Sequence, residues 1–497
     1  MTGPCSSLAS GRRLALRLGL IAPLLLAGCS VGPRYARPAA PQAPQYKELP
    51  PNWKAAQPND QIAKGKWWEV FQDAQLNVLE DQINASNQTL KAAQAQFDQA
   101  RALVRANRSS YYPTVSAGVG ATRAHASTAR PNGQFISKNP YTDLLFAVDL
   151  SYEIDVWGRV RHTVQAARAS AQATAADLET VNLSLHAELA VDYFQLRTLD
   201  ADSQLLDSTV ESYTRALELT QSRYSGGVAS QVDVAQAQTQ LETTRAQAID
   251  VHVQRAQFEH AIAVLLGKAP ATFSLPPMPL NTTPPVVPIG LPSELLERRP
   301  DIAGQERRMA AANEQIGVAT AAFYPTISLN ATGGFEGNPI TNWFVTPGGF
   351  VAAGASAVET IFDAGRRRAL SDQAKAAYDQ SVANYRETVL TAFQEVEDNL
   401  VALRLLEAES RTQQGAVEAA QHSLALSNNR YKGGVASYLE VTTAQSAALA
   451  DQRTLVEIAG RRMNASVLLI KALGGSWDAS TLPPVGDGKH PYTPSGQ

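Results

Sequence analysis

The sequence contains two nearly identical eight-residue segments that lie 207 positions apart. Residues 223–230 read RYSGGVAS and residues 430–437 read RYKGGVAS. The surrounding sequence recurs at the same offset, because Gly158 corresponds to Gly365. A repeat of this length indicates a duplicated module whose two copies pack with pseudo-symmetry, and not a solenoid of short repeats.

Each copy of the module is expected to contain one long helical hairpin. Residues 159–225 contain neither Pro nor Gly, and residues 366–432 contain only Gly415. At a rise of 1.5 Å per residue, a helix of this length would be about 100 Å long. Returning helices are expected at 228–267 and 435–474. The turns between the helices contain two glycines each: Gly226, Gly227, Gly433 and Gly434.

Apolar residues in the second long segment recur every three or four positions. They are Tyr378, Val382, Tyr385, Val389, Phe393, Val396, Leu400 and Leu403. This spacing predicts a seam of the kind found between the helices of a coiled coil. A rigid stalk or a large helical bundle would have the same spacing, so the pattern alone does not predict a channel.

Residues 1–28 have the pattern of a secretory signal peptide that is removed. Basic residues at 12–17 lead into an apolar stretch at 14–26, which is too short for a membrane-spanning helix. The stretch ends in Leu-Ala-Gly-Cys, which resembles the bacterial lipobox and predicts acylation of Cys29. Several acyl chains anchor a protein stably to a membrane. Cys5 lies in the removed segment, so a disulfide scaffold and a Cys-ligated metal are excluded.

Proline-rich segments divide the rest of the chain. Residues 29–66 are expected to form the lipid anchor and an extended tether, and residues 270–292 a linker between the repeats. The first repeat is then 67–269 and the second 293–475. Residues 476–497 are expected to form a flexible tail.

Two segments before each long helix predict a β-hairpin, at 113–156 and at 325–362. In residues 146–155 every even position is apolar, and every odd position is small or acidic. This is the length and alternation of a membrane-spanning strand with one face toward lipid and one toward water. Residues 350–362 alternate poorly. An ordinary soluble sheet is the alternative interpretation.

Four strands cannot close into a barrel, and an open sheet edge in lipid leaves backbone groups unsatisfied. Three chains would supply twelve strands, an even number within the bacterial range. The expected fold is therefore mainly α with a small transmembrane β part. A trimer would combine an α-helical tunnel with a 12-stranded β-barrel. Asp149, Glu153 and Asp155 are predicted to line the lumen of that barrel.

Several motifs together resemble the TolC-type outer membrane efflux family. They are the segments 223–230 and 430–437, YYPTVS at 111–116, FYPTIS at 323–328, and LERRPDI at 296–302. The lipobox is similar to that of the OprM/NodT lipoprotein branch. The resemblance implies a homotrimeric, passive exit duct for small amphiphilic cargo in the outer membrane. It also implies docking onto a periplasmic adaptor and an inner-membrane pump of the RND type.

The resemblance further implies a gate at the periplasmic tip of the helices. Tyr224 and Tyr431 close the long helices, and Asp233 and Glu440 are expected about two turns into the returning helices. In a trimer these carboxylates would form acidic rings that favour cations. Thr443 stands where some family members carry a second Asp, so this sequence departs from a double acidic ring. Alternatively, the two carboxylates are solvated groups stabilised by a helix dipole.

The sequence contains no motif of an enzyme and predicts no cofactor. None of the seven His has a metal-binding spacing to another, and no phosphate loop, nucleophile elbow or zinc motif is present. A net charge of -3 without a long basic run argues against nucleic acid as a partner. The remaining alternatives to an efflux duct are a protein-secretion exit and a trimeric lipoprotein spacer without a lumen. Alternating strands and paired glycine turns favour a duct, because a spacer needs neither.

Overall fold

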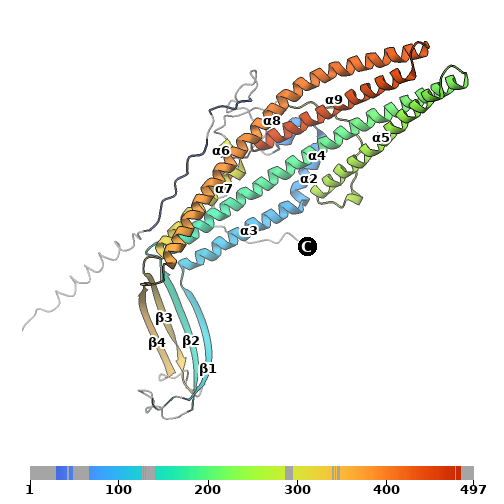
Figure 1. The fold of residues 1–497 in the computed structure, drawn as a ribbon. Helices are drawn as coiled ribbons and strands as arrows, with labels where there is room; N and C mark the ends of the chain where they lie inside the picture. Colours follow the sequence, from blue (N-terminus) through green and yellow to red (C-terminus); the bar gives the residue numbers. More distant parts are fainter. Residues whose placement is uncertain are drawn as a thin grey trace, which may run out of the picture.

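The computed structural model describes most of the chain. The described residues are 30–41, 44–48, 66–125, 127, 129, 140–285, 295–338, 341, 343, 348–475 and 477–482. Figure 1 shows an elongated molecule, with a small β-sheet at one end and long helices that extend away from it. The predicted fold class, mainly helical with a small β part, is therefore confirmed. Cys29 and the predicted signal peptide lie outside the described residues.

The two longest helices have the same length. α4 spans Arg159–Ser225 and α8 spans Arg366–Lys432, and each contains 67 residues. Each helix follows a glycine, Gly158 or Gly365, whose φ is 86° or 87°. This left-handed conformation has little cost only for glycine. The glycine therefore lets the chain turn from a strand into the helix at that residue.

The returning helices begin later than the sequence predicted. α5 spans Gln231–Leu265 and α9 spans Tyr438–Ala472, so the expected starts at Val228 and Val435 are wrong. A serine with extended backbone precedes each helix and holds the N-cap position. Serine is preferred there because its side chain can accept a hydrogen bond from a backbone N–H of the first turn.

The four strands form one antiparallel sheet in the order β1-β2-β3-β4. Their bounds are Thr114–Ala124, Tyr141–Ile154, Thr326–Glu336 and Gly349–Val358. β1 and β2 belong to the first repeat, and β3 and β4 to the second. The repeats therefore meet at the centre of the sheet, where Asp149 of β2 lies opposite Thr332 of β3. β1 and β4 form the two edges.

The register places most of the large apolar side chains of β1, β2 and β3 on one face of the sheet. Residues opposite each other in adjacent strands share a face, and Val119, Phe146 and Phe335 lie in one such row. β4 follows this pattern only in part, because Val351 lies on this face opposite Gly333, whereas Phe350 and Val358 lie on the other face. Val119 is 77% exposed and Val351 is 83% exposed. Among the described residues, no helix is both long and apolar enough to cross a membrane.

The main apolar core lies where the shorter helices pack against the long ones. α2 (Ala74–Ser86) and α3 (Gln88–Arg108) contact α4, and α7 (Pro300–Ala321) contacts both α4 and α8. The tilted rings of Phe71 and of Phe194 in α4 pack in this core, with centroids 5.0 Å apart. The remaining short elements are η1 (Trp67–Phe71), η2 (Ser109–Tyr111), η4 (Pro270–Thr272), α6 (Leu295–Arg298) and η8 (Ala479–Thr481).

Beyond the core, the four helices of the two hairpins lie side by side in the order α5, α4, α9, α8 (Figure 1). Along the hairpins, α4 and α9 form the main contact between the repeats, in addition to the contact of α7 with α4, and α5 and α8 are the outer helices. An ion pair crosses the central contact, because Arg453 of α9 donates to Asp202 of α4 at 2.8 and 2.9 Å. The helices thus have the same arrangement as the strands, with the repeats joined at the centre.

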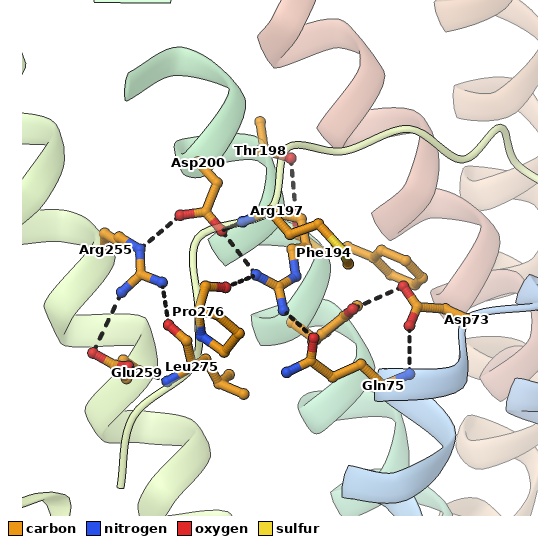
Figure 2. A network of polar contacts seen from close by, with 12 residues as sticks. Asp73, Gln75, Phe194, Arg197, Thr198, Asp200, Arg255, Glu259, Leu275 and Pro276 are labelled. Carbon is orange, nitrogen blue, oxygen red and sulfur yellow. Dashed lines mark hydrogen bonds and ion pairs between the residues drawn. The ribbon is translucent and has the colours of Figure 1, made fainter. Parts of the chain in front are cut away.

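A buried polar network holds the linker between the repeats against the first hairpin (Figure 2). Arg197 of α4 is almost fully buried and donates to Asp200, Gln75 and the Pro276 carbonyl at 2.8 to 2.9 Å. Arg255 of α5 donates to the other carboxylate oxygen of Asp200 at 2.6 Å. One buried carboxylate is therefore shared by two guanidinium groups, which joins α2, α4, α5 and the linker.

Replacing Arg197 with Met is expected to destabilise the protein by about 3 kcal/mol, because the buried Asp200 carboxylate would lose one of its two cationic partners. Thermal unfolding of the purified protein measures this loss. Arg215→Met is the matched control on the same helix. Arg215 pairs with Glu211 at the surface, where ion pairs contribute about 0.5 kcal/mol. Equal effects of the two substitutions would contradict the role given to the buried network.

Candidate functional site

The far ends of the helical hairpins are two turns of the same geometry. In the first, the Val228 N–H donates to the Arg223 carbonyl at 2.8 Å, and the Gly227 N–H donates to the Tyr224 carbonyl at 2.9 Å. Gly434 and Val435 make the corresponding bonds in the second turn. This is the Schellman pattern that ends many helices.

The two glycines of each predicted pair have different roles. Gly227 and Gly434 have φ of 75° and 74°, in the left-handed region. Gly226 and Gly433 have φ of -79° and -75°, which any residue can adopt. The turn therefore requires only the second glycine of each pair for conformational reasons.

The predicted acidic residues lie closer to the tip than expected. Asp233 and Glu440 are the third residues of α5 and α9, so the expectation of two turns into these helices is wrong. They lie closer to the tip because α5 and α9 begin three residues later than expected. Asp233 forms a capping box, in which its carboxylate accepts from the Ser230 N–H at 3.0 Å. Glu440 is exposed and pairs with Arg430 of its own hairpin at 3.2 Å.

The two tip tyrosines are equivalent in sequence but differ in burial. Tyr431 is 6% exposed and packs edge to face against Tyr438, with ring centroids 5.1 Å apart. Tyr224 is 47% exposed. The difference arises because Tyr431 lies in the contact between the two hairpins, whereas Tyr224 remains outside that apolar cluster.

Arg223 connects the two tips and was not singled out by the sequence. Its guanidinium lies 4.8 Å from the centre of the Tyr431 ring. It also donates to the carbonyls of Tyr431 and Lys432 at 3.3 and 3.2 Å. A cation over an aromatic ring is attracted by the negative face of that ring. The sequence did contain a signal for this contact, because the Arg-Tyr dipeptide of residues 223–224 recurs at 430–431.

The contact between the hairpins near the tip is apolar and contains several tyrosine side chains. Tyr431, Tyr438 and Val441 pack with Ala237 of the first hairpin. Burial raises the pKa of Tyr438 to about 12, so the phenol is neutral at physiological pH. The Tyr213 hydroxyl donates to the Gln445 carbonyl at 3.1 Å, and burial raises its pKa as well. These two phenol groups therefore contribute no charge to the contact between the hairpins.

The three carboxylates predicted for a barrel lumen have different surroundings. Asp149 is exposed on the polar face of the sheet, in one row with Ser116 and Thr332. Glu153 accepts from Arg159 at 2.8 Å. Asp155 lies beyond the end of β2 and accepts from two backbone N–H groups at the start of α4, at 2.9 Å each. The prediction of a strand position for Asp155 is therefore wrong, because the residue caps a helix.

The described chain begins at the junction between the sheet and the helices. The Ser30 hydroxyl lies 2.9 Å from Nε2 of His162, and the Val31 N–H donates to the Trp157 carbonyl at 3.1 Å. His162 in turn contacts Glu314 of α7 at 2.6 Å. The residues that follow Cys29 are thus held at the base of the sheet. Within the described part of the chain, no group of three or more His, Cys, Asp or Glu is placed to hold a metal ion.

Comparison with known proteins agrees with this architecture. A family model described as outer membrane efflux protein matches residues 79–268 and 291–475. The toluene efflux pump outer membrane protein TtgF of Pseudomonas putida is 33% identical over 477 residues, which cover 94% of this chain and 98% of that protein.

Two solved structures have the same fold. The outer-membrane channel OprN superposes with a TM-score of 0.82 at 28% identity, over 90% of this chain and 100% of that chain. The open state of the MtrE outer membrane channel of Neisseria gonorrhoeae superposes with a TM-score of 0.79 at 26% identity, over 91% of this chain and 99% of that chain.

Duplicated long hairpins joined to a small sheet with an exposed apolar face define an outer-membrane exit channel of an efflux pump, and not an enzyme. The chain belongs to the outer membrane efflux protein family.

Replacing Gly227 with Ala is expected to strain the first tip turn by about 1 kcal/mol, because an L-residue is disfavoured at φ of 75°. Hydrogen exchange of the Val228 amide should become faster, since its bond to the Arg223 carbonyl depends on this turn. Gly226→Ala is the matched control, because the φ of Gly226 is negative. Faster exchange in the control and not in Gly227→Ala would contradict the assignment.

Proposed function

We propose that three copies of this chain form a passive exit duct for small amphiphilic molecules. The observation that carries the proposal is the sheet, which has an exposed apolar face and two edges without partners within the described chain. Its strands contain 10 to 14 residues. A strand of about 9 to 11 residues is long enough to cross a bilayer. Twelve such strands from three chains would form a closed barrel without edges.

The helical part would continue the duct into the periplasm. α4 and α8 are each about 100 Å long at 1.5 Å per residue. Their tips, at the end of the molecule opposite the sheet, would meet a periplasmic adaptor and an inner-membrane pump of the RND type. The pump supplies the energy, and this chain supplies the conduit.

The proposed duct is held in the outer membrane by lipid as well as by its barrel. The Leu-Ala-Gly-Cys motif supports acylation of Cys29. Ser30 and Val31 are fixed beside His162 and Trp157. Acyl chains on the preceding residue would therefore enter the membrane next to the base of the sheet.

Deleting the chain from its host is expected to increase susceptibility to hydrophobic antibiotics, dyes and solvents. Toluene is the cargo named for the related pump protein TtgF, which supports apolar small molecules as the class to test. Growth on a panel of such compounds measures the effect in a strain that lacks redundant exit ducts. Unchanged susceptibility to the whole panel would end the proposal and would favour a spacer without a lumen.

Asp233 and Glu440 are proposed to form acidic rings at the tip, with Tyr224 and Tyr431 beside them. Both carboxylates lie in the first turn of a returning helix. Replacing them together, as Asp233→Asn and Glu440→Gln, is expected to lower the preference for cations and to change the single-channel conductance. The control is Glu242→Gln, because Glu242 is an exposed carboxylate farther along α5. Identical conductance and ion preference in the double variant and the wild type would contradict the proposal of acidic rings.

A further inference from the structure

The first described residues of the chain, 30–41 and 44–48, form an extended segment that runs from the sheet along α7 toward α8 (Figure 1, dark blue). We call these residues the amino-terminal strap. Near its start, the side-chain amide of Asn313 in α7 donates to the Pro33 carbonyl at 3.1 Å. The first part of the strap is therefore attached to a helix of the second repeat.

The far end of the strap is attached to α8. The backbone N–H groups of Lys47 and Glu48 both donate to the carboxylate of Glu397, at 2.7 and 2.9 Å. The preceding residue, Tyr46, is buried in the main core. Because both ends of the strap are held, its middle part keeps a fixed position over the helices.

The middle part of the strap forms one wall of a cavity with a volume of about 560 Å³. The other walls come from α4, α7 and the segment 479–482. A volume of about 300 to 1,000 Å³ is usual for a site that holds a small molecule. The residues that determine the chemistry of this cavity are Tyr35 and Arg37 of the strap, Ala303, Glu306 and Arg307 of α7, and Leu482.

Both carboxylate oxygens of Glu306 already have partners within the lining. One oxygen accepts a hydrogen bond from the Tyr35 hydroxyl at 2.6 Å, and the other pairs with the neighbouring Arg307. Burial and the hydrogen bond to Glu306 raise the pKa of Tyr35, so the phenol stays neutral at physiological pH. A ligand therefore meets a carboxylate whose charge is paired.

Guanidinium groups outnumber carboxylates among the described lining residues. Arg37 and Arg307 line the cavity from the strap and from α7, whereas Glu306 supplies one negative charge. The Arg37 side chain is oriented by Tyr385 of α8, because its Nε donates to the phenol oxygen at 3.2 Å. The lining therefore has a positive balance of charge.

We propose that this cavity binds a small amphiphile that carries one carboxylate or phosphate group. The anionic group contacts Arg37 and Arg307, and the apolar body contacts Ala303 and Leu482. A guanidinium group binds either anion strongly, because two parallel N–H groups match two oxygen atoms. The cavity lies within one chain, so the proposal holds or fails independently of the trimeric duct.

A ligand in this cavity would also fasten the strap. It touches the strap, α7 and residues 479–482 at once, so it binds only when the strap is in place. A ligand that binds one arrangement of a protein stabilises that arrangement by mass action. Binding is therefore expected to hold the segment that follows the predicted acyl anchor against the helices.

Equilibrium dialysis of the full-length protein in detergent tests the site with 1-naphthoate, with detergent alone as the blank. Saturable binding is expected. The neutral compound 1-naphthamide has the same ring system without the charge, and it should bind more weakly by about tenfold. Absence of saturable naphthoate binding, or equal binding of the two compounds, would overturn the proposal.

Variants of the strap test which arginine binds the anion. Arg37→Gln should weaken the binding of naphthoate by about tenfold, and Arg37→Lys should weaken it less because the charge remains. Arg34→Gln is the matched control, because Arg34 is an exposed arginine of the same strap that does not line the cavity. Equal effects of the two glutamine variants would overturn the assignment of Arg37.

The Glu306→Gln variant provides a test with the opposite sign. The glutamine keeps an oxygen that can accept from Tyr35, but it removes the negative charge from the lining. Naphthoate should therefore bind more tightly, while the affinity for naphthamide stays unchanged. Thermal unfolding checks that the variant is folded. Weaker naphthoate binding by a variant that unfolds at the wild-type temperature would overturn the proposed charge selection.

Hydrogen exchange shows whether the ligand lies against the strap. Saturating naphthoate should slow the exchange of the backbone amides of Tyr35, Ala36 and Arg37. The amides of α5 are the control, because α5 does not line the cavity. Naphthoate binding that leaves exchange in the strap unchanged would place the ligand elsewhere and overturn the proposal.

Competition experiments identify the source of the anion. Displacement of naphthoate by dihexanoyl phosphatidylglycerol, a water-soluble form of an anionic membrane lipid, would support the site and assign its ligand to the membrane. Displacement by salicylate alone would support the site and assign its ligand to soluble aromatic acids. Failure of both compounds to displace naphthoate would overturn the proposal.

Discussion

The backbone groups along the outer edges of β1 and β4 impose the constraint on which the rest of the structure depends. In the described sheet, each of these strands has a partner on one side only. An unpaired N–H or C=O costs several kcal/mol in lipid, where no water can replace the missing partner. The apolar face of this sheet is suited to lipid, and in the proposed trimer the strands of neighbouring copies pair with both edges. The helical hairpins are continuous with the strands and would follow the ring that those strands form.

The sequence predicted the helices and strands whose formation depends on residues close to one another in the chain. The two 67-residue helices were predicted with the observed bounds, because Gly158 and Gly365 mark their starts and no Pro interrupts them. Three strands were predicted from their alternation, and the fourth, which alternates poorly, from its position as the second member of a hairpin. The returning helices were placed too early, because the residues after the glycines were assigned to the helix. The serine before each helix was the available local signal for the true start.

The sequence did not predict the contacts that depend on packing between distant segments. Arg197 and Arg223 look alike in sequence, each one arginine in a long polar helix. One is buried between a carboxylate, an amide and the linker, and the other lies over an aromatic ring of the second repeat. Asp155 was assigned to a strand because it continues the alternation of β2, but its carboxylate binds the start of α4 instead. Local sequence patterns cannot distinguish these outcomes, because each depends on which distant residue the side chain contacts in the folded chain.

The buried network around Arg197 also bears on the order in which the chain acquires structure. All of its members, from Gln75 to Met278, precede the second repeat in the sequence. Domains generally fold as units, with the amino-terminal part first during synthesis. The first module can therefore fix its own linker while the second is still being made. The second module then packs against a first module that is already folded. This lowers the chance that the two similar halves exchange segments with each other.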